Sequence, residues 1–460
     1  MAEGEARGRV QSAERPGMRA FGIVWLGQFA SIFGNGLTGF AIAIWVWQET
    51  GQATALALIP VFMWLPGLIV GPVAGALVDR WNRRRVLMLA DFGSSLAIFG
   101  LFVLYQLGLL EIWHLYAATA VSSLFNAFQW PAFSASITLM VAKENYSRAS
   151  GLMSLAESAS FILSPIVAAV LIGFLDLGQI LLIDMLTFMV ALFTLLISRI
   201  PEPDRSQAEP LNAKSLVADS WFGFLYIWRR TSLLGIQSLM FSYNFVKSFG
   251  FAVLPAMILA RTGENAVALG TVQSSAAVGG VIGGLILSVW PGTRRQIHGV
   301  LLGTILASLF TQLLFGLGRD VIVWSVFALV GTMFRPWINA ANQAIWQRKV
   351  APELQGRVFG ARATIALISL PLGYLFAGPL ADHVFEPAMM PGGALADAFG
   401  PLVGTGPGAG MALMTVLSGV LTVAIGVTGY FIYAVREAES IIPDHRAEET
   451  KDAVAGAVQT

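Results

Sequence analysis

Four ionisable side chains lie inside long apolar runs of the sequence, where an isolated charge is costly. Glu157 and Asp184 are in the first half of the chain, and Lys247 and Arg335 are in the second. Charged groups in such surroundings are paired, bind a ligand or carry protons. Two interpretations stay open. The acids and the cations pair and help to close a path, or the cations contact an anionic or acceptor-rich substrate while Glu157, with Asp184 beside it as a candidate, carries a proton.

Uncharged polar residues accompany these four in a repeated pattern. Gln28 and Asn35 are two helical turns apart, hence on one helix face, and Gln237 and Asn244 repeat this spacing. A single amide of this kind usually bonds a neighbouring helix, but the whole set predicts the lining of a wet cavity. The candidate cavity residues are Gln28, Asn35, Asn126, Gln129, Trp130, Gln237, Asn244, Lys247, Arg335, Asn339 and Asn342.

Most other chemistry is excluded by composition. The chain has no cysteine, so a disulfide framework, a thiolate nucleophile and a cysteine-ligated metal are impossible. Its four histidines lie at the edges of apolar runs, in loops or in the tail, with no metal-ligand spacing and no nucleophile–base pair. Lysine and arginine occur in short clusters separated by long apolar gaps, which does not suit nucleic acid. We therefore expect no enzyme, no metal and no cofactor.

The elements that must position these residues are membrane helices. Hydrophobic residues make up 56% of the chain, charged residues 12%, and the mean hydropathy is +0.70. Apolar runs of about 20 residues span a bilayer as helices. The fold class is therefore an all-α membrane protein. Twelve helices are expected over residues 20–48, 54–78, 86–107, 113–140, 149–175, 177–198, 231–260, 267–290, 298–318, 321–346, 358–380 and 410–434.

The cationic residues decide the orientation of the chain. Clusters follow the second, fourth, eighth and tenth expected helices, and further ones occur in both tails and in the central segment. Because cytoplasmic loops carry the excess of Lys and Arg, we expect both termini in the cytoplasm.

The two halves repeat each other at an offset of 209 residues. Gln28 then falls on Gln237 and Asn35 on Asn244. Each half has six helices with both ends inside, which indicates a parallel repeat with a site near the membrane midplane. The expected division is a cytoplasmic tail (1–19), a six-helix bundle (20–198), a cytoplasmic linker (199–230), a second six-helix bundle (231–434) and a second tail (435–460). The end of the linker is either an interfacial helix or a simple entry into the seventh helix.

The stretch "GALVDRWNRRRVLMLAD", residues 75–91, is a charged loop between two apolar helices. It resembles motif A of the major facilitator superfamily, in which a glycine, an Asp-Arg pair and a basic cluster follow at fixed spacing. The resemblance implies a cytoplasmic gate whose Asp faces the start of the eleventh helix and whose arginines reach acids near the fourth. The gate residues implied by motif and repeat are Gly75, Asp79, Arg80, Arg83, Arg84, Glu144, Arg148, Glu353 and Arg357. Asp91, at the low end of the third helix, is interpreted as structural.

The macrolide-efflux and enterobactin-exporter branch is the nearest by resemblance, from "ELQGRVFG" at 353–360 and the Gly/Pro-rich outer loop at 378–411. It implies a monomeric exporter of drug-like or siderophore-like amphipathic molecules in a prokaryotic plasma membrane, driven by a proton gradient. Ser164-Pro165 stands where antiporters often have Gly-Pro, and the fourth helix has no arginine. The alternative is therefore an uncoupled facilitator or importer of a small, possibly anionic, solute.

Overall fold

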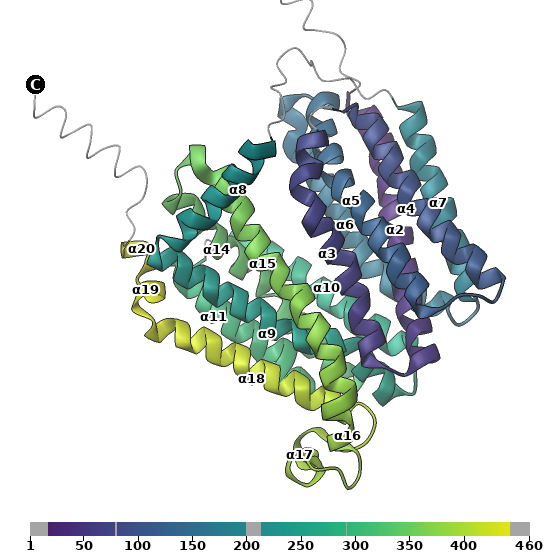
Figure 1. Ribbon diagram of the computed structural model, residues 1–460, viewed down its shortest axis with the longest axis vertical. Helices are drawn as coiled ribbons and strands as arrows, with labels where there is room; N and C mark the ends of the chain where they lie inside the picture. The colour runs from purple at the N-terminus through teal and green to yellow at the C-terminus, as the bar shows by residue number, and fades with distance from the viewer. Residues whose placement is uncertain (1–16, 79–80, 199–212, 291, 442–460) are drawn as a thin grey trace, which may run out of the picture. The chain divides into compact units, whose positions relative to one another are not determined.

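The computed structural model describes residues 17–78, 81–198, 213–290 and 292–441, and the regular structure in these residues is entirely helical (Figure 1). Asp79 and Arg80 lie outside the described residues, as do most of both tails and the first part of the linker.

The helices of the first half follow the apolar runs closely. They are α2 (Gly17–Thr50), α3 (Ala53–Val78), α4 (Arg83–Gln106), α5 (Ile112–Met140), the short 3-10 turn η1 (Lys143–Asn145), α6 (Tyr146–Leu171) and α7 (Leu177–Ile197). A separate helix of the linker, α8 (Ala213–Trp228), ends before α9 begins, so the described part of the linker is a helix of its own and not a straight extension of α9.

The second half has more interruptions in its helices. Its elements are α9 (Thr231–Thr262), α10 (Ala266–Val289), α11 (Gln296–Ser308), η2 (Leu309–Leu314), α12 (Phe315–Leu317), α13 (Val321–Thr332), α14 (Arg335–Lys349), α15 (Pro352–Leu380), η3 (Ala381–Phe385), α16 (Glu386–Met389), α17 (Ala396–Val403), α18 (Ala409–Phe431), α19 (Tyr433–Arg436) and α20 (Ala438–Ile441). Both η2 and η3 are π-helical segments.

Eleven helical segments in the described residues are long and apolar enough to cross a membrane, and α5 is a further helix of 29 residues. The prediction of an all-α, multi-span membrane protein is confirmed. Two details differ from the expected spans. The tenth expected helix is divided into α13 and α14 around Met333 and Phe334. The eleventh continues through η3 and α16 to Met389, into the stretch expected to be an outer loop.

Side chains at helix starts explain why several helices begin where they do. Asp176 accepts a hydrogen bond from the backbone N–H of Gln179 at the start of α7 (2.8 Å), and Asp320 accepts from two N–H groups at the start of α13 (2.9 and 3.0 Å). Asn265 does the same for α10. Such N-caps satisfy donors that the first helical turn leaves unpaired.

The chain forms two compact units that only roughly follow its halves. Unit 1 comprises residues 1–46 and 62–211, and unit 2 comprises residues 47–61 and 212–460. The end of α2 and the start of α3 therefore belong with the second half of the chain. Each unit is described by itself below.

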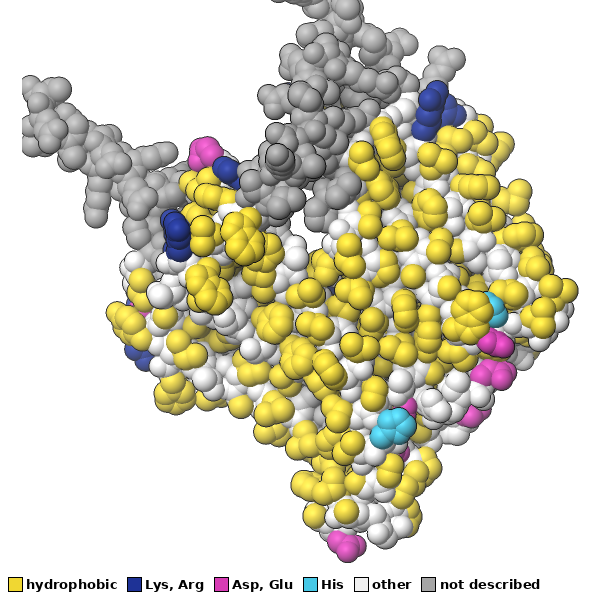
Figure 2. All heavy atoms as spheres, in the orientation of Figure 1, with side chains coloured by type: hydrophobic (Ala, Val, Ile, Leu, Met, Phe, Trp, Pro, Cys, Tyr) yellow, Lys and Arg dark blue, Asp and Glu magenta, His cyan; other side chains and the backbone are white. Residues whose placement is uncertain are grey.

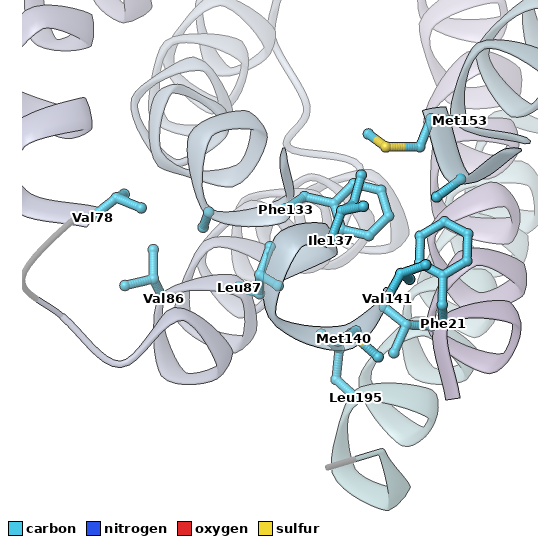
Figure 3. Packing of buried hydrophobic residues seen from close by; sticks show 13 residues of the cluster. Phe21, Val78, Val86, Leu87, Phe133, Ile137, Met140, Val141, Met153 and Leu195 are labelled. Atoms are coloured by element: carbon cyan, nitrogen blue, oxygen red, sulfur yellow. The ribbon is translucent and has the colours of Figure 1, made fainter. Parts of the chain in front are cut away.

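The core of unit 1 joins six helices near one end of the unit, with Val78 contributed by α3. Phe21 of α2, Leu87 of α4 and Leu195 of α7 are completely buried, and Phe133 and Met153 add α5 and α6 (Figure 3). Close packing of side chains from so many helices fixes the ends of α4 and α7 against each other, which positions the polar residues one to three turns away.

The core of unit 2 is built around α9, which packs against α15 and α18. Helix α8 packs on α15, with Tyr226 and Ile227 against Val358 and Ala361. Gly223 permits this approach, because a Cβ there would lie 2.3 Å from the carbonyl oxygen of Arg357. Figure 2 shows hydrophobic side chains over most of the surface facing the viewer, as lipid contact requires.

Candidate functional site

The polar centre of unit 1 is a buried carboxylate held by two amides. The Nε2 of Gln129 on α5 donates to Oδ1 of Asp91 on α4 at 2.6 Å, and the Nε2 of Gln28 on α2 donates to Oδ2 at 3.2 Å. Gln129 also lies 3.3 Å from Oε1 of Gln28. Asp91 and Gln28 are each 3% exposed. Three helices are thus tied by one charge-assisted cluster.

A small cavity of about 10 Å³ connects Asp91 with a second buried carboxylate, Asp184 of α7. That volume is about what one water molecule needs. Asp184 is 4% exposed, and its Oδ2 has no hydrogen-bond partner among the described residues. Gly34 of α2 allows the carboxylate to sit there, because a Cβ at that position would lie 2.6 Å from Asp184 Oδ1. The polar residues that line the cavity are Ser31, Asn35, Asp91, Ser94, Ser95, Asn126, Gln129 and Asp184.

The structure brings together most, but not all, of the residues predicted for the first half. Asn35 and Asn126 line this cavity and are exposed, whereas Trp130 is 55% exposed and does not line it. Glu157 is half-buried on α6 and is also absent from the lining. Asp91 was assigned a structural role near the basic loop, yet the two amides predicted for the cavity are its partners.

Unit 2 carries cations where unit 1 carries acids. The Nζ of Lys247 on α9 lies 5.0 Å from the ring centre of Tyr243 and 5.7 Å from that of Phe251. Arg335, the first residue of α14, is exposed and close enough for its charge to act on Lys247 and Tyr374. Within the described residues of unit 2, no acidic side chain forms an ion pair with either cation. Aromatic faces stabilise a cation without neutralising it.

A second polar cluster in unit 2 lies nearer the N-terminus of α9. The Nε2 of Gln237 donates to the backbone oxygen of Arg362 on α15 at 3.1 Å, and Arg362 donates to Gln343 Oε1 at 2.8 Å. The Arg362 guanidinium lies 5.1 Å from the ring centre of Trp346, whose Nε1 donates to Oδ1 of Asn342 at 3.1 Å.

These contacts show which polar side chains of unit 2 already have hydrogen-bond partners. Gln237 and Asn342 both have partners inside the unit, while Asn244 is half-buried and Asn339 is exposed. The sequence position of Arg362 gives no sign that its guanidinium stacks on Trp346.

The residues expected at a cytoplasmic gate are distributed over several helix ends. Arg84 donates to the backbone oxygens of Leu195 and Leu196 at 2.9 and 2.5 Å, at the C-terminus of α7. A cation is favourable at that end of a helix dipole. Arg84 therefore bonds carbonyl groups of α7, whereas the resemblance implied acids near the fourth helix.

The other gate residues have fewer contacts that can be described. Gly75 lies in the last turn of α3, and Arg83 is half-buried. Arg357 stacks over the ring of Phe222 at 4.6 Å. The remaining described members are exposed, namely Glu144, Arg148 and Glu353. Asp79 and Arg80 lie outside the described residues.

Comparisons with known proteins agree with this architecture. The family model described as Major Facilitator Superfamily matches residues 24–374. Macrolide efflux protein A of Streptococcus pyogenes is 27% identical over 379 residues, which cover 79% of this chain and 90% of that protein. The multidrug efflux pump Tap of Mycolicibacterium fortuitum is 25% identical over 361 residues, 76% of this chain and 86% of that protein.

Solved structures match the fold at low sequence identity. A bacterial homologue of the human lysosomal transporter Spinster, in an inward-facing conformation, has a TM-score of 0.64 at 15% identity, covering 91% of this chain and 97% of that one. A bacterial homologue of the iron transporter ferroportin has a TM-score of 0.62 at 14% identity, covering 89% and 98%.

Proposed function

The chain belongs to the Major Facilitator Superfamily of membrane transporters, and we propose that it is a secondary active transporter that exports hydrophobic or amphipathic small molecules by proton antiport with alternating access. The names of its relatives support export of this class of substrate, because they include macrolide efflux proteins and a multidrug efflux pump. The family consists of transporters and not of enzymes.

The proposed setting is a prokaryotic plasma membrane with both termini in the cytoplasm. The positions of the arginine clusters support this orientation, and the relatives named above are bacterial. The proposed division keeps two six-helix bundles, 20–198 and 231–434, joined by a cytoplasmic linker at 199–230.

The observation that carries the coupling proposal is the pair of carboxylates in unit 1. Asp91 and Asp184 line one cavity of about 10 Å³, too small for a drug-like molecule but large enough for about one water. Asp91 already accepts two amide donors, whereas Oδ2 of Asp184 has no partner among the described residues. A buried carboxylate without a countercharge is costly, so binding a proton removes a large penalty. Asp184 is thus the stronger candidate for the proton carrier, and half-buried Glu157 is the second.

The substrate contact is proposed for unit 2, where the amine of Lys247 lies near the rings of Tyr243 and Phe251 and Arg335 is close enough for its charge to act on Lys247. A molecule with an apolar body and an acidic or acceptor-rich group matches this combination of rings and cations. The uncharged residues Asn244, which is half-buried, and Asn339, which is exposed, are proposed to supply further hydrogen bonds to the substrate.

Transport by purified protein in liposomes tests the proposal. A proton gradient is imposed, lumenal pH is followed, and a panel of macrolides and siderophores is added to wild type, Asp184→Asn and Glu157→Gln. Asp176→Asn is the matched control, because Asp176 is an exposed N-cap and asparagine caps a helix equally well.

We expect substrate-triggered proton movement in wild type and the control, and its loss in Asp184→Asn. Loss in Glu157→Gln alone would move the proton site to α6. Substrate flux without any proton movement would contradict antiport and favour the uncoupled facilitator or importer.

A further inference from the structure

Helix α3 begins at Ala53, after a residue of a type that rarely caps a helix. The residue before it is Gln52, a poor N-cap, and the Gln52 N–H itself bonds Thr50 Oγ1 at 3.2 Å. The α7, α10 and α13 helices, in contrast, start with Asp176, Asn265 and Asp320. The unpaired donors of the first turn of α3 must therefore be satisfied from elsewhere.

The missing cap is supplied by a residue far along the chain. Oδ1 of Asp382 accepts from the N–H of Ala53 at 2.9 Å, and Oδ2 accepts from the N–H of Thr54 at 2.8 Å. Asp382 lies in η3, directly after α15, and is separated from Ala53 by 329 positions. Both contacts are charge-assisted, and the positive end of the α3 dipole adds to them.

The backbones of the two helices touch at the same place. A Cβ on Gly378 of α15 would lie 2.5 Å from Cα of Thr54 and 3.2 Å from Cβ of Ala57. Ala57 is only 1% exposed. This close fit and the cap by Asp382 are intact only while α3 and α15 are together. They explain why residues 47–61 group with unit 2.

A cavity of about 510 Å³ lies beside this contact. Its lining includes Gly51 and Gln52, which precede α3, together with Asp382 and Glu386. From the positive-inside pattern, the connection between α2 and α3 faces the outside of the cell. On that orientation, the contact between Asp382 and α3 lies at the outer ends of both helices.

We propose that Asp382 is the positioning residue that holds α3 against α15 and closes the outer end of the transport path. The inference rests on the proposed alternating access, in which the first-half helix α3 and the second-half helix α15 must separate for release outside. Separation breaks both hydrogen bonds of Asp382 at once and exposes two N–H groups of α3. Asp382 thereby sets how often the outer end opens, through its hold on α3 and not through chemistry of its own.

The test uses the absence of native cysteine, which lets one introduced thiol report on the contact. The reporter is Ala57→Cys, and its rate of reaction with a membrane-impermeant maleimide is measured in proteoliposomes without any substrate. Asp382→Ala removes both acceptors, Asp382→Asn keeps one, and Asp397→Ala changes an exposed acid of α17 as the control. Gly378→Ala separates the two backbones without touching the carboxylate.

We expect labelling to accelerate on the order of tenfold in Asp382→Ala, equivalent to about 1.4 kcal/mol in the opening equilibrium. The labelling rate should rise less in Asp382→Asn, should also rise in Gly378→Ala, and should not change in Asp397→Ala. A second reporter, Ala412→Cys in the buried face of α18, detects unfolding. Unchanged labelling in Asp382→Ala, or equal acceleration at both reporters, would overturn the inference.

This outcome is independent of the proposed substrate and coupling ion. Faster labelling without transport of any macrolide or siderophore leaves the role of Asp382 intact and removes the proposed function. Proton-coupled transport together with labelling that Asp382→Ala does not change would support the proposed function and overturn the role of Asp382.

Discussion

Gln28 of α2 and Gln237 of α9 occupy corresponding positions in the two halves, and each is 3% exposed, yet they have different partners. Gln28 donates to the carboxylate of Asp91, whereas Gln237 donates to the backbone oxygen of Arg362. The repeat has kept a buried amide on the same helix face. The acceptor of that amide differs between the two halves.

Other charged positions of one half also correspond to uncharged residues in the other half. At the offset of 209, Asp91 corresponds to Val300, which is completely buried, and Lys247 corresponds to Thr38. Arg335 corresponds to Asn126. The first half has thus gathered carboxylates and the second half cations. A duplicated scaffold fixes where side chains are placed, while each half is free to acquire its own charge, and this supports separate handling of proton and substrate.

The largest loss of stability is expected when Asp91 of unit 1 is replaced by valine, the residue at the corresponding position of unit 2. Asp91→Val leaves the Gln28 amide without its acceptor and Gln129 with only a 3.3 Å contact to Gln28. We expect a loss of about 3 kcal/mol in the free energy of unfolding, because buried donors are left unpaired. Thermal unfolding in detergent, followed by tryptophan fluorescence, measures it. Asp91→Asn keeps an acceptor and should lose less; equal loss in both would show that the charge and not the hydrogen bonds matters.

The second prediction compares the two glutamines directly. Gln28→Leu removes a donor from a buried carboxylate and should cost about 2 kcal/mol, whereas Gln237→Leu removes one from a neutral carbonyl and should cost about 1 kcal/mol. The two variants are matched in burial and in chemical change. Unfolding midpoints in the same detergent measure both losses. A loss in Gln237→Leu that equals or exceeds the loss in Gln28→Leu would contradict the stronger hydrogen bond assigned to Gln28.

The contrast also shows what the sequence can predict. Apolar run length predicts the helices well, because a bilayer forces each span to be long and continuous. The break between α13 and α14 was missed, because Pro336 is tolerated in a first helical turn and the apolar pattern continues through it. The continuation of α15 through η3 was missed because Pro379, Pro387 and the nearby glycines predict a loop.

Side-chain partners were harder to predict than helices. The polar faces of α2 and α9 followed from spacing, but spacing within a helix does not tell which neighbour a side chain meets. Asp91 could have been suspected from Ser94 and Ser95 one turn later, since the three form a polar face on α4. Asp382 gave no signal at all, because its partners are backbone N–H groups 329 positions away.

The third prediction concerns the cations of unit 2. Lys247→Gln should weaken binding of substrates with an acidic group on the order of tenfold, which corresponds to about 1.4 kcal/mol, and leave neutral analogues nearly unchanged. Quenching of tryptophan fluorescence during titration measures both affinities. Arg294→Gln, at an exposed helix end, is the matched control. A loss of equal size for neutral analogues would mean that Lys247 supports the fold and does not recognise charge.

The smallest effect is expected at the other end of unit 2, where charge is exposed to water. Arg295 lies 3.4 Å from Glu437, with side chains 55% and 22% exposed. The hydroxyl of Ser440, together with Arg295 and Arg436, holds the pKa of Glu437 below its ordinary value. Exposed pairs of this kind contribute little, so Glu437→Gln should lower the unfolding midpoint less than Gln237→Leu does.

The sign of the pH dependence distinguishes this pair from the buried clusters. Because the folded-state pKa of Glu437 is lowered, its contribution is present above the unfolded-state pKa and disappears as pH falls through the folded-state value. Unfolding midpoints of wild type and Glu437→Gln should therefore differ by a constant amount down to about pH 5 and converge only as the pH falls below about 4. A difference that widens on acidification would mean that the carboxylate is stabilised in its protonated form, and the pairing with Ser440 and Arg295 would not describe it.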